Sequence, residues 1–204
     1  MMSMRNIVTP GELIAPAPVM VKNAYIEGGK TYSKVLGMYD GAGRGIIPLE
    51  GAWCPTPEDT VVGMISEVKN KVYVADLSYF GRSLIVPGKY DEYNFSEGDI
   101  IAAKIKDVES RRTVILKEAE LLEGGTLIRV KPKKVLRIIG KKDTMISQIA
   151  ALTKTQIVVG MNGIIWLRGG NLALATEAIF RVEREAHTSG LTETIKLFLE
   201  TKSV

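Results

Sequence analysis

The stretch from residue 126 to residue 170 constrains the fold most, because it combines high positive charge with regular apolar spacing. Between Arg129 and Lys142 the chain carries seven Lys or Arg residues and no Asp or Glu. Apolar residues recur in the same stretch at intervals typical of packed secondary structure, which a solvated basic tail would lack. The sequence therefore predicts a folded module that presents a strongly basic surface.

The residue pattern of this module predicts the order strand, helix, turn, helix, strand, strand, helix. Residues 127–131 are expected to form a strand, and residues 133–139 a short helix that ends at Gly140, since glycine tolerates the left-handed conformation at helix ends. The second helix has one apolar face at helical spacing (Met145, Ile146, Ile149, Ala150 and Thr153). Residues 155–159 and 164–168 are expected to form a hairpin through a turn at 161–163, and Asn171 to cap the last long helix.

This order, with a basic glycine-containing turn between the first two helices, resembles the KH RNA-binding module. Modules of that family hold a few nucleotides of single-stranded backbone at a Gly-X-X-Gly turn. A turn that leads into a helix offers unpaired N–H groups and a positive dipole end, so a phosphate fits there. We therefore expect RNA contacts from the basic side chains before and within the turn (Lys133, Lys134, Arg137, Lys141 and Lys142).

The fourth position of the turn is Asp143 where the family has glycine. An aspartate at this position is suited to cap the following helix with its own carboxylate, which would occupy the N–H groups that a phosphate needs. We expect this capping role and, with it, weak RNA binding at the turn. The alternative is that the turn from Gly140 to Asp143 contacts RNA directly.

Length, composition and charge limit the classes of protein that fit. At 204 residues the chain is long for one domain, so two or three small domains are expected. No apolar run is long enough to span a membrane, and no segment resembles a signal peptide. A single cysteine, Cys54, excludes an internal disulfide and a multi-thiolate metal site and fits a cytoplasmic protein. Residues 129–204 carry 13 basic and 6 acidic side chains, so positive charge is concentrated in the C-terminal third.

The first 57 residues are rich in Gly and Pro, and their short alternating runs predict a small β domain. Strands are expected at residues 19–21, 25–26, 32–36 and 46–47. The run Gly-Ala-Gly-Arg-Gly at residues 41–45 is expected to form a tight hairpin, because no helix pattern follows it as a phosphate-binding loop would require. Pro48, Pro55 and Pro57 then interrupt the pattern and mark a domain boundary.

The next segment, residues 58–123, predicts a five-stranded OB barrel with a long connection before the fourth strand. Strands are expected at residues 60–68, 72–76, 83–86, 99–108 and 113–117. In that fold, the loop of the first hairpin and the loop between the fourth and fifth strands flank the nucleic-acid face. Lys69 and Lys71 fall in the first loop, and Arg111 and Arg112 fall in the second. The alternative is that both tips are basic only because they are solvated.

Tyr79, Phe80 and Arg82 are expected in the loop before the third strand of this barrel. An aromatic ring that faces a nucleic-acid groove adds about 1–3 kcal/mol of base stacking. The alternative for Tyr79 and Phe80 is that one or both rings pack in the barrel wall. We include all three residues among the expected RNA contacts.

Further motifs resemble one protein family along nearly the whole chain. Residues 58–65 (EDTVVGMI) and 97–105 (EGDIIAAKI) look like the two signature strands of the ribosomal-protein-S-one type of OB domain. Residues 8–12 (VTPGE) look like the N-terminal domain of exosome cap subunits, and residues 160–163 (GMNG) fit the GXNG signature of the same family. In this order the motifs are similar to the archaeal exosome family of ribosomal-RNA-processing protein four.

The resemblance implies a multidomain chain, mainly β plus α+β. It places an N-terminal β domain at residues 1–57, an S-one type OB barrel at 58–123 and a type I KH module at 124–204. In the family, three copies cap a hexameric ring of ribonuclease-PH-like subunits. The N-terminal domain docks on the ring, the barrels surround the entry pore, and the KH modules lie outward.

The same resemblance implies a non-catalytic role, in which the cap captures single-stranded RNA and feeds it to the ring for 3′-to-5′ degradation or processing. It also implies that the GXNG turn supports packing between the KH and OB modules and does not contact RNA. The Asn-Gly step of that turn is expected to supply the positive φ angles of a tight hairpin. Binding is expected to be electrostatic, with little sequence preference.

No set of residues predicts catalysis, a metal site or a cofactor. The acidic residues fall at expected strand ends and turns, where solvated charge is the default, and His187, near the end of the last helix, is expected to be structural. The alternative function is a stand-alone OB/KH RNA-binding factor of transcription or translation. The stand-alone factor would be favoured if the N-terminal domain packs only within its own chain and presents no apolar or edge-strand surface. The basic run disfavours a purely structural spacer.

Overall fold

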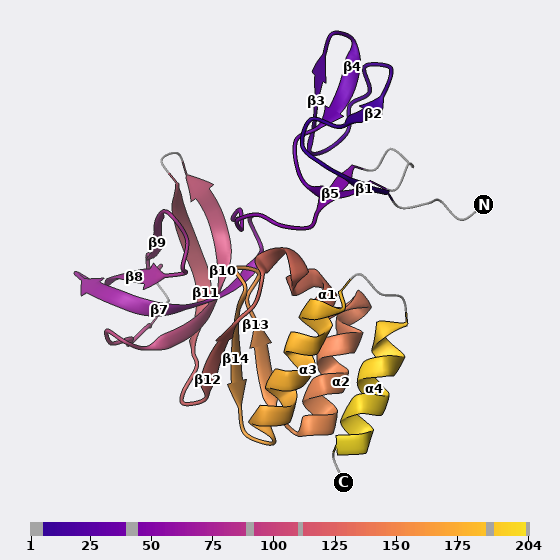
Figure 1. Cartoon of the computed structure of the whole chain (residues 1–204). Helices are drawn as coiled ribbons and strands as arrows, with labels where there is room; N and C mark the ends of the chain where they lie inside the picture. Colours follow the sequence, from indigo (N-terminus) through magenta and orange to yellow (C-terminus); the bar gives the residue numbers. More distant parts are fainter. Residues whose placement is uncertain (1–5, 40–44, 89–91, 110–111, 187–189, 203–204) are drawn as a thin grey trace. The chain divides into compact units, whose positions relative to one another are not determined.

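The computed structural model of the chain describes residues 6–39, 45–88, 92–109, 112–186 and 190–202 (Figure 1). It contains two compact units, Met1–Ala52 and Trp53–Val204. The division falls a few residues before the boundary expected at residue 57, and the second unit holds both the barrel and the KH module.

The N-terminal unit consists of two three-stranded antiparallel sheets, which confirms a small β domain. Strands β1 (Asn6–Val8), β5 (Gly37–Tyr39) and β6 (Ile46–Pro48) form one sheet in that order. Strands β2 (Leu13–Ala15), β4 (Lys30–Ser33) and β3 (Ala24–Glu27) form the other. A small core of Val8, Val21 and Ile46 holds the unit together.

The strand predicted at residues 19–21 is wrong. The buried hydroxyl of Thr31 holds this segment instead: it accepts a hydrogen bond from the N–H of Val19 at 2.8 Å and donates one to the carbonyl of Ala17 at 2.8 Å. A side chain therefore satisfies backbone groups that a neighbouring strand would otherwise pair. The hairpin predicted at residues 41–45 lies, apart from Gly45, outside the described residues.

The barrel begins the second unit and has the strand order β10-β11-β9-β8-β7 around a closed ring. Its strands are β7 (Thr60–Lys69), β8 (Val72–Asp76), β9 (Arg82–Ile85), β10 (Ile100–Glu109) and β11 (Thr113–Leu121). β9 and β11 pair in parallel and the other neighbours pair antiparallel, which is the OB arrangement that the sequence predicted. Inward-facing apolar side chains fill the centre (Val61, Ile65, Ile85, Ile101, Ile105, Val114 and Leu116).

The KH module follows with a three-stranded antiparallel sheet covered by helices. Its strands are β12 (Thr126–Arg129), β13 (Gln156–Val159) and β14 (Ile164–Arg168), in the order β12-β14-β13. Its helices are α1 (Val135–Ile139), α2 (Thr144–Thr153), α3 (Leu172–Arg184) and α4 (Leu191–Lys202), with 3₁₀ turns at Pro132–Lys134 and Lys141–Asp143. The order of elements confirms the type I KH prediction.

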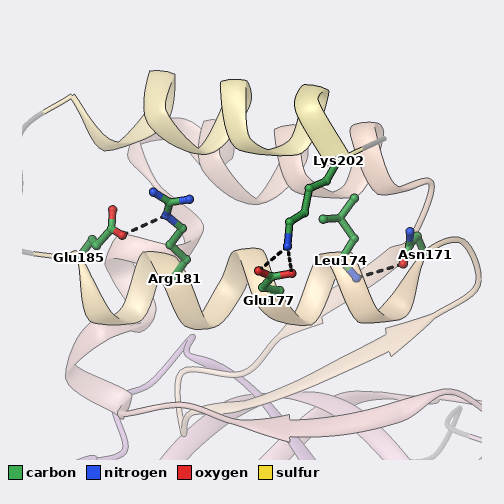
Figure 2. Close-up of polar contacts among 6 residues, drawn as sticks. All are labelled: Asn171, Leu174, Glu177, Arg181, Glu185 and Lys202. Atoms are coloured by element: carbon green, nitrogen blue, oxygen red, sulfur yellow. Dashed lines mark hydrogen bonds and ion pairs between the residues drawn. The ribbon is translucent and has the colours of Figure 1, made fainter. Parts of the chain in front are cut away.

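The last two helices pack against each other, and α4 also contacts α2. Asn171 caps α3 as predicted, because its side-chain oxygen accepts a hydrogen bond from the N–H of Leu174 at 3.0 Å (Figure 2). α4 buries Leu191, Ile195 and Leu199 in the same core as α3. On the outside, Lys202 of α4 reaches both carboxylate oxygens of Glu177 on α3, at 2.8 and 2.9 Å.

The barrel and the KH module share a buried junction at the GXNG turn. The side chain of Asn162 donates to the carbonyls of Val62 at 2.7 Å and Leu77 at 3.0 Å, and accepts from the N–H of Val62 at 3.3 Å. Around it, Val62 packs with Ile164 and Trp166. The turn therefore joins the two modules, as the resemblance implied. Positive φ angles were expected at both Asn162 and Gly163. Gly163 has a positive φ of 84°, but the φ angle of Asn162 is not positive.

Candidate nucleic-acid interface

The loop between β8 and β9 and the hairpin between β10 and β11 meet at one end of the barrel. The guanidinium carbon of Arg112 lies 5.2 Å from the centre of the Phe80 ring. A Cβ at Gly81 would collide with the backbone oxygen of Arg112 and with the Tyr79 ring, so a glycine is needed for this close approach. Arg82 begins β9 opposite Thr113, the residue after Arg112. The structure thus brings Phe80, Arg82 and Arg112 together.

Phe80 and Tyr79 play different parts in this loop. The Phe80 ring is 82% exposed and is available to a ligand. Tyr79 is half-buried, packs against the barrel core and meets Trp53 edge to face at 5.6 Å between ring centres. For Tyr79, packing in the barrel wall is therefore what the structure shows. Arg111, the other arginine of the predicted pair, lies outside the described residues.

Lys69 ends β7 and Lys71 lies in the tight turn before β8, where Asn70 and Lys71 have positive φ angles of 47° and 64°. This turn lies at the opposite end of β9 from Arg112, because β8 runs antiparallel to β9 with Tyr73 opposite Ile85. Lys69 forms an exposed ion pair with Glu67 of its own strand. The two basic loops therefore flank the β8–β9–β11 face and do not form a single cluster.

The face between the two loops carries an apolar row that the sequence did not reveal. Val74 of β8, Leu84 of β9 and Ile115 of β11 are direct neighbours across the strands, and each side chain is half-buried. Apolar–polar alternation along each strand could have identified these outward-facing positions. Only the parallel pairing of β9 with β11 shows that the three residues lie in one row. An apolar strip bordered by cations and an exposed ring suits single-stranded nucleic acid, whose bases stack while its phosphates need positive charge.

The KH module supplies a second group of cations. Lys141 and Lys142 are exposed on the turn before α2, whereas Lys133 and Lys134 are half-buried before α1. Arg137 is exposed on α1, and its Nε donates to the carbonyl of Ala186 at 2.8 Å, beyond the end of α3. His187 itself lies outside the described residues. The basic stretch is thus folded and solvent-accessible, but its members face different neighbours.

The expected capping by Asp143 is wrong. Asp143 stands at the N-cap position of α2, but its side chain makes no capping hydrogen bond. Its backbone adopts a left-handed conformation with φ of 59°, as does Lys142 with φ of 54°, whereas a capping residue usually has an extended backbone. Asp tolerates the left-handed region better than most residues, so it can occupy a position that glycine holds elsewhere.

The described residues contain no group of three or more His, Cys, Asp or Glu side chains that could hold a metal ion. Burial raises the pKa of the Asp59 carboxyl at the start of the barrel.

None of the helices in the described ranges is long and apolar enough to cross a membrane.

Comparisons with known proteins agree with this architecture. Residues 5–50 match the family model of the exosome RNA binding protein RRP4 N-terminal domain, and residues 125–172 match that of the KH domain. A solved crystal structure described as an exosome complex RNA-binding protein matches with a TM-score of 0.63 at 27% identity. The match covers 74% of this chain and 97% of that one.

Relatives that match along most of this chain share the same name in several archaea. The chain is 36% identical to "Exosome complex component Rrp4" of Pyrococcus horikoshii, over 96% of this chain and 82% of the relative. It is 38% identical to the protein of that name from Thermococcus kodakarensis, over 96% and 85%. It is 36% identical to the protein of that name from Methanothermus fervidus, over 96% of this chain and 95% of the relative. This chain therefore belongs to the Rrp4 family of exosome complex components.

Proposed function

We propose that this chain is a non-catalytic RNA-binding cap subunit of an archaeal exosome, which captures single-stranded RNA and passes it to a ribonuclease-PH-like ring for 3′-to-5′ degradation or processing. The observation that carries the proposal is the exposed Phe80 ring beside Arg112 at the edge of the barrel face. An exposed aromatic next to a cation serves stacking and phosphate neutralisation together. The names of the relatives support the exosome as the setting, and the single exposed Cys54 suits work in the cytoplasm.

The RNA contacts of this proposal come from two modules. On the barrel they are Lys69, Lys71, Phe80, Arg82, Arg111 and Arg112, supported by Tyr79, and on the KH module they are Lys133, Lys134, Arg137, Lys141 and Lys142. The half-buried Tyr79 acts mainly by supporting the loop that presents Phe80. Each lysine or arginine that meets a phosphate releases counterions, so binding tracks the backbone and shows little sequence preference.

The N-terminal unit favours a complex subunit over a stand-alone RNA-binding factor. Several of its apolar side chains are exposed, above all Met20 at 89% and Ile7 at 64%. Its two small sheets also end in short edge strands that can pair or pack with another protein. We infer that this unit docks on the ring, with three copies of the chain per complex.

The RNA-binding part is tested by the salt dependence of affinity. Fluorescence anisotropy with labelled decauridylate should show a linear fall of log affinity with log salt concentration. Arg111→Glu combined with Arg112→Glu should flatten the slope by roughly 0.7 for each phosphate of the single strand that these arginines neutralise. Lys196→Glu with Lys202→Glu, on α4, is the charge-matched control and should leave the slope unchanged. An unchanged slope in the arginine variant would remove these arginines from the interface.

The same preparation tests the non-catalytic part. The purified chain should not shorten 5′-labelled RNA, with or without phosphate or magnesium. Cleavage that persists through purification would contradict the proposal.

Docking is tested by co-purification from the source cell. The chain should bring down ribonuclease-PH-like subunits, and Met20→Lys should abolish this because it places a charge on an exposed apolar surface. RNA affinity serves as the control and should not fall in that variant. Recovery of the ring with Met20→Lys would remove this side chain from the docking surface.

A further inference from the structure

A groove of about 550 Å³ lies between the KH helices and the first residues of the barrel. Its floor and walls are apolar, from Leu136, Ile139, Ile146, Ile157, Val159 and Met161. Its polar lining consists of Glu58, Asp59, Thr60 and Asp143. No lysine or arginine among the described residues lines it, although the neighbouring residues 129–142 form the most basic part of the chain.

One side of this groove is the edge strand β13. The sheet order β12-β14-β13 leaves β13 with one strand partner; the start of β7 contacts β13, and just past its end the N–H of Met161 donates to the carbonyl of Thr60 at 2.8 Å. Its residues Ile157, Val158 and Val159 are half-buried, whereas Ile164 to Leu167 of the central strand β14 are fully buried. An edge strand presents backbone N–H and C=O groups that can pair with another chain. Four residues at about 3.3 Å each give an edge of about 13 Å, enough for a short extended peptide.

The carboxylates give the groove a preference for positive charge. The Asp143 side chain lies at the turn that would otherwise hold a phosphate, and it makes no capping hydrogen bond. Asp59 adds a second carboxylate, while Glu58 is partly neutralised by Lys117 at 2.6 Å. A phosphodiester in the groove would meet like charge over an apolar floor, whereas a Lys or Arg would meet opposite charge.

We propose that this groove binds an extended peptide segment of another protein. The peptide adds to the part of the β13 edge that β7 leaves open, places alternate apolar side chains on the groove floor and sets a Lys or Arg beside Asp143. Main-chain pairing supplies affinity and the alternate side-chain pockets supply specificity, as in other cases of strand addition.

The test pans a random dodecapeptide library, displayed on phage, against the full-length chain. Enriched sequences are synthesised with a fluorescent label and their affinity is measured by fluorescence polarisation. We expect peptides that alternate apolar residues and contain Lys or Arg. Leu136→Lys should weaken them at least tenfold, because Leu136 is a groove residue that is already 68% exposed and tolerates a polar substitution. Leu197→Lys on α4, where the leucine is 64% exposed and outside the groove, is the matched control and should have no effect.

A second readout separates peptide from RNA in the same groove. With methyl-labelled methionine, the peptide should shift the NMR signal of Met161, which lines the groove, and leave that of Met64 on the barrel unchanged. Decauridylate should not shift Met161. The proposal is overturned if no peptide is enriched, if affinity survives Leu136→Lys, or if decauridylate alone shifts Met161. Because these readouts do not depend on RNA affinity, they can fail while the proposed RNA-binding function stands.

Discussion

Tyr79 and Phe80 are adjacent aromatic residues with opposite environments. Tyr79 closes one end of the barrel against Trp53, so its ring is a packing element. Phe80 extends into solvent and touches Arg112, and that exposure makes it available to a base. The sequence identified the loop but did not show which ring packs and which is exposed, because side-chain directions along an irregular loop follow no fixed alternation.

Phe80→Ala should weaken binding of single-stranded RNA by roughly 1–3 kcal/mol, the usual value of one base–aromatic stack. The ring is 82% exposed, so the free energy of unfolding in urea should change by no more than about 0.5 kcal/mol. Fluorescence anisotropy and urea unfolding measure the two effects on the same protein. Full RNA affinity in this variant would show that the ring does not stack.

Asn162 and Asp143 show what one sequence can and cannot reveal about single residues. Both positions were recognised as special, since each sits in a motif. Their roles depend on groups outside the motif: Asn162 binds the backbone of Val62 and Leu77, which lie 100 and 85 residues away in the chain. No local pattern encodes such a partner. The left-handed backbone of Asp143 likewise depends on how α1 and α2 are joined.

At the scale of elements, regular spacing made the helices and long strands predictable. β8 and β14 were predicted with their observed bounds and β7 to within one residue, because apolar residues recur along all three. The short strands of the N-terminal unit were less predictable, since three or four residues carry little periodic signal. The partner of α4 was also beyond the sequence; it packs on α2 and α3.

The contribution of α4 to stability should come from its buried face and not from its ion pairs. Ile195 is fully buried, so Ile195→Ala should lower the free energy of unfolding by about 2–5 kcal/mol, because it removes buried apolar atoms and leaves a cavity. Lys202→Ala removes the half-exposed pair with Glu177 and should cost at most about 1 kcal/mol. Urea unfolding of both variants gives the comparison. If Lys202→Ala lowered the free energy of unfolding more than Ile195→Ala, the ion pair and not the buried face would be the main contribution of α4.

At the scale of the whole molecule, the barrel and the KH module form one unit with a continuous interface. Val62 of the barrel is fully buried against Ile164 and Trp166 of the KH sheet, and Asn162 hydrogen-bonds across the same junction. The sequence predicted the order of the modules and, through the family resemblance, their packing. It did not predict the groove, because the groove is lined by residues 58–60 and by residues between 136 and 161, which belong to two different modules.

This shared interface predicts that the two modules unfold together. In the unaltered chain, fluorescence of Trp53 and Trp166 reports on the barrel and the junction, and circular dichroism reports on the KH helices. The two urea midpoints should coincide. Asn162→Asp keeps an acceptor but removes both donors to buried carbonyls, so it should cost about 2 kcal/mol or more and lower both midpoints. Midpoints that differ in the unaltered chain would contradict this prediction.

The buried amide at the junction also restricts how such proteins can be recombined. A chimera that joins the barrel of one homologue to the KH module of another would inherit an asparagine positioned for carbonyls that its new neighbour must supply. Successful grafts should therefore exchange both modules as a single cassette, with the crossover placed before Trp53.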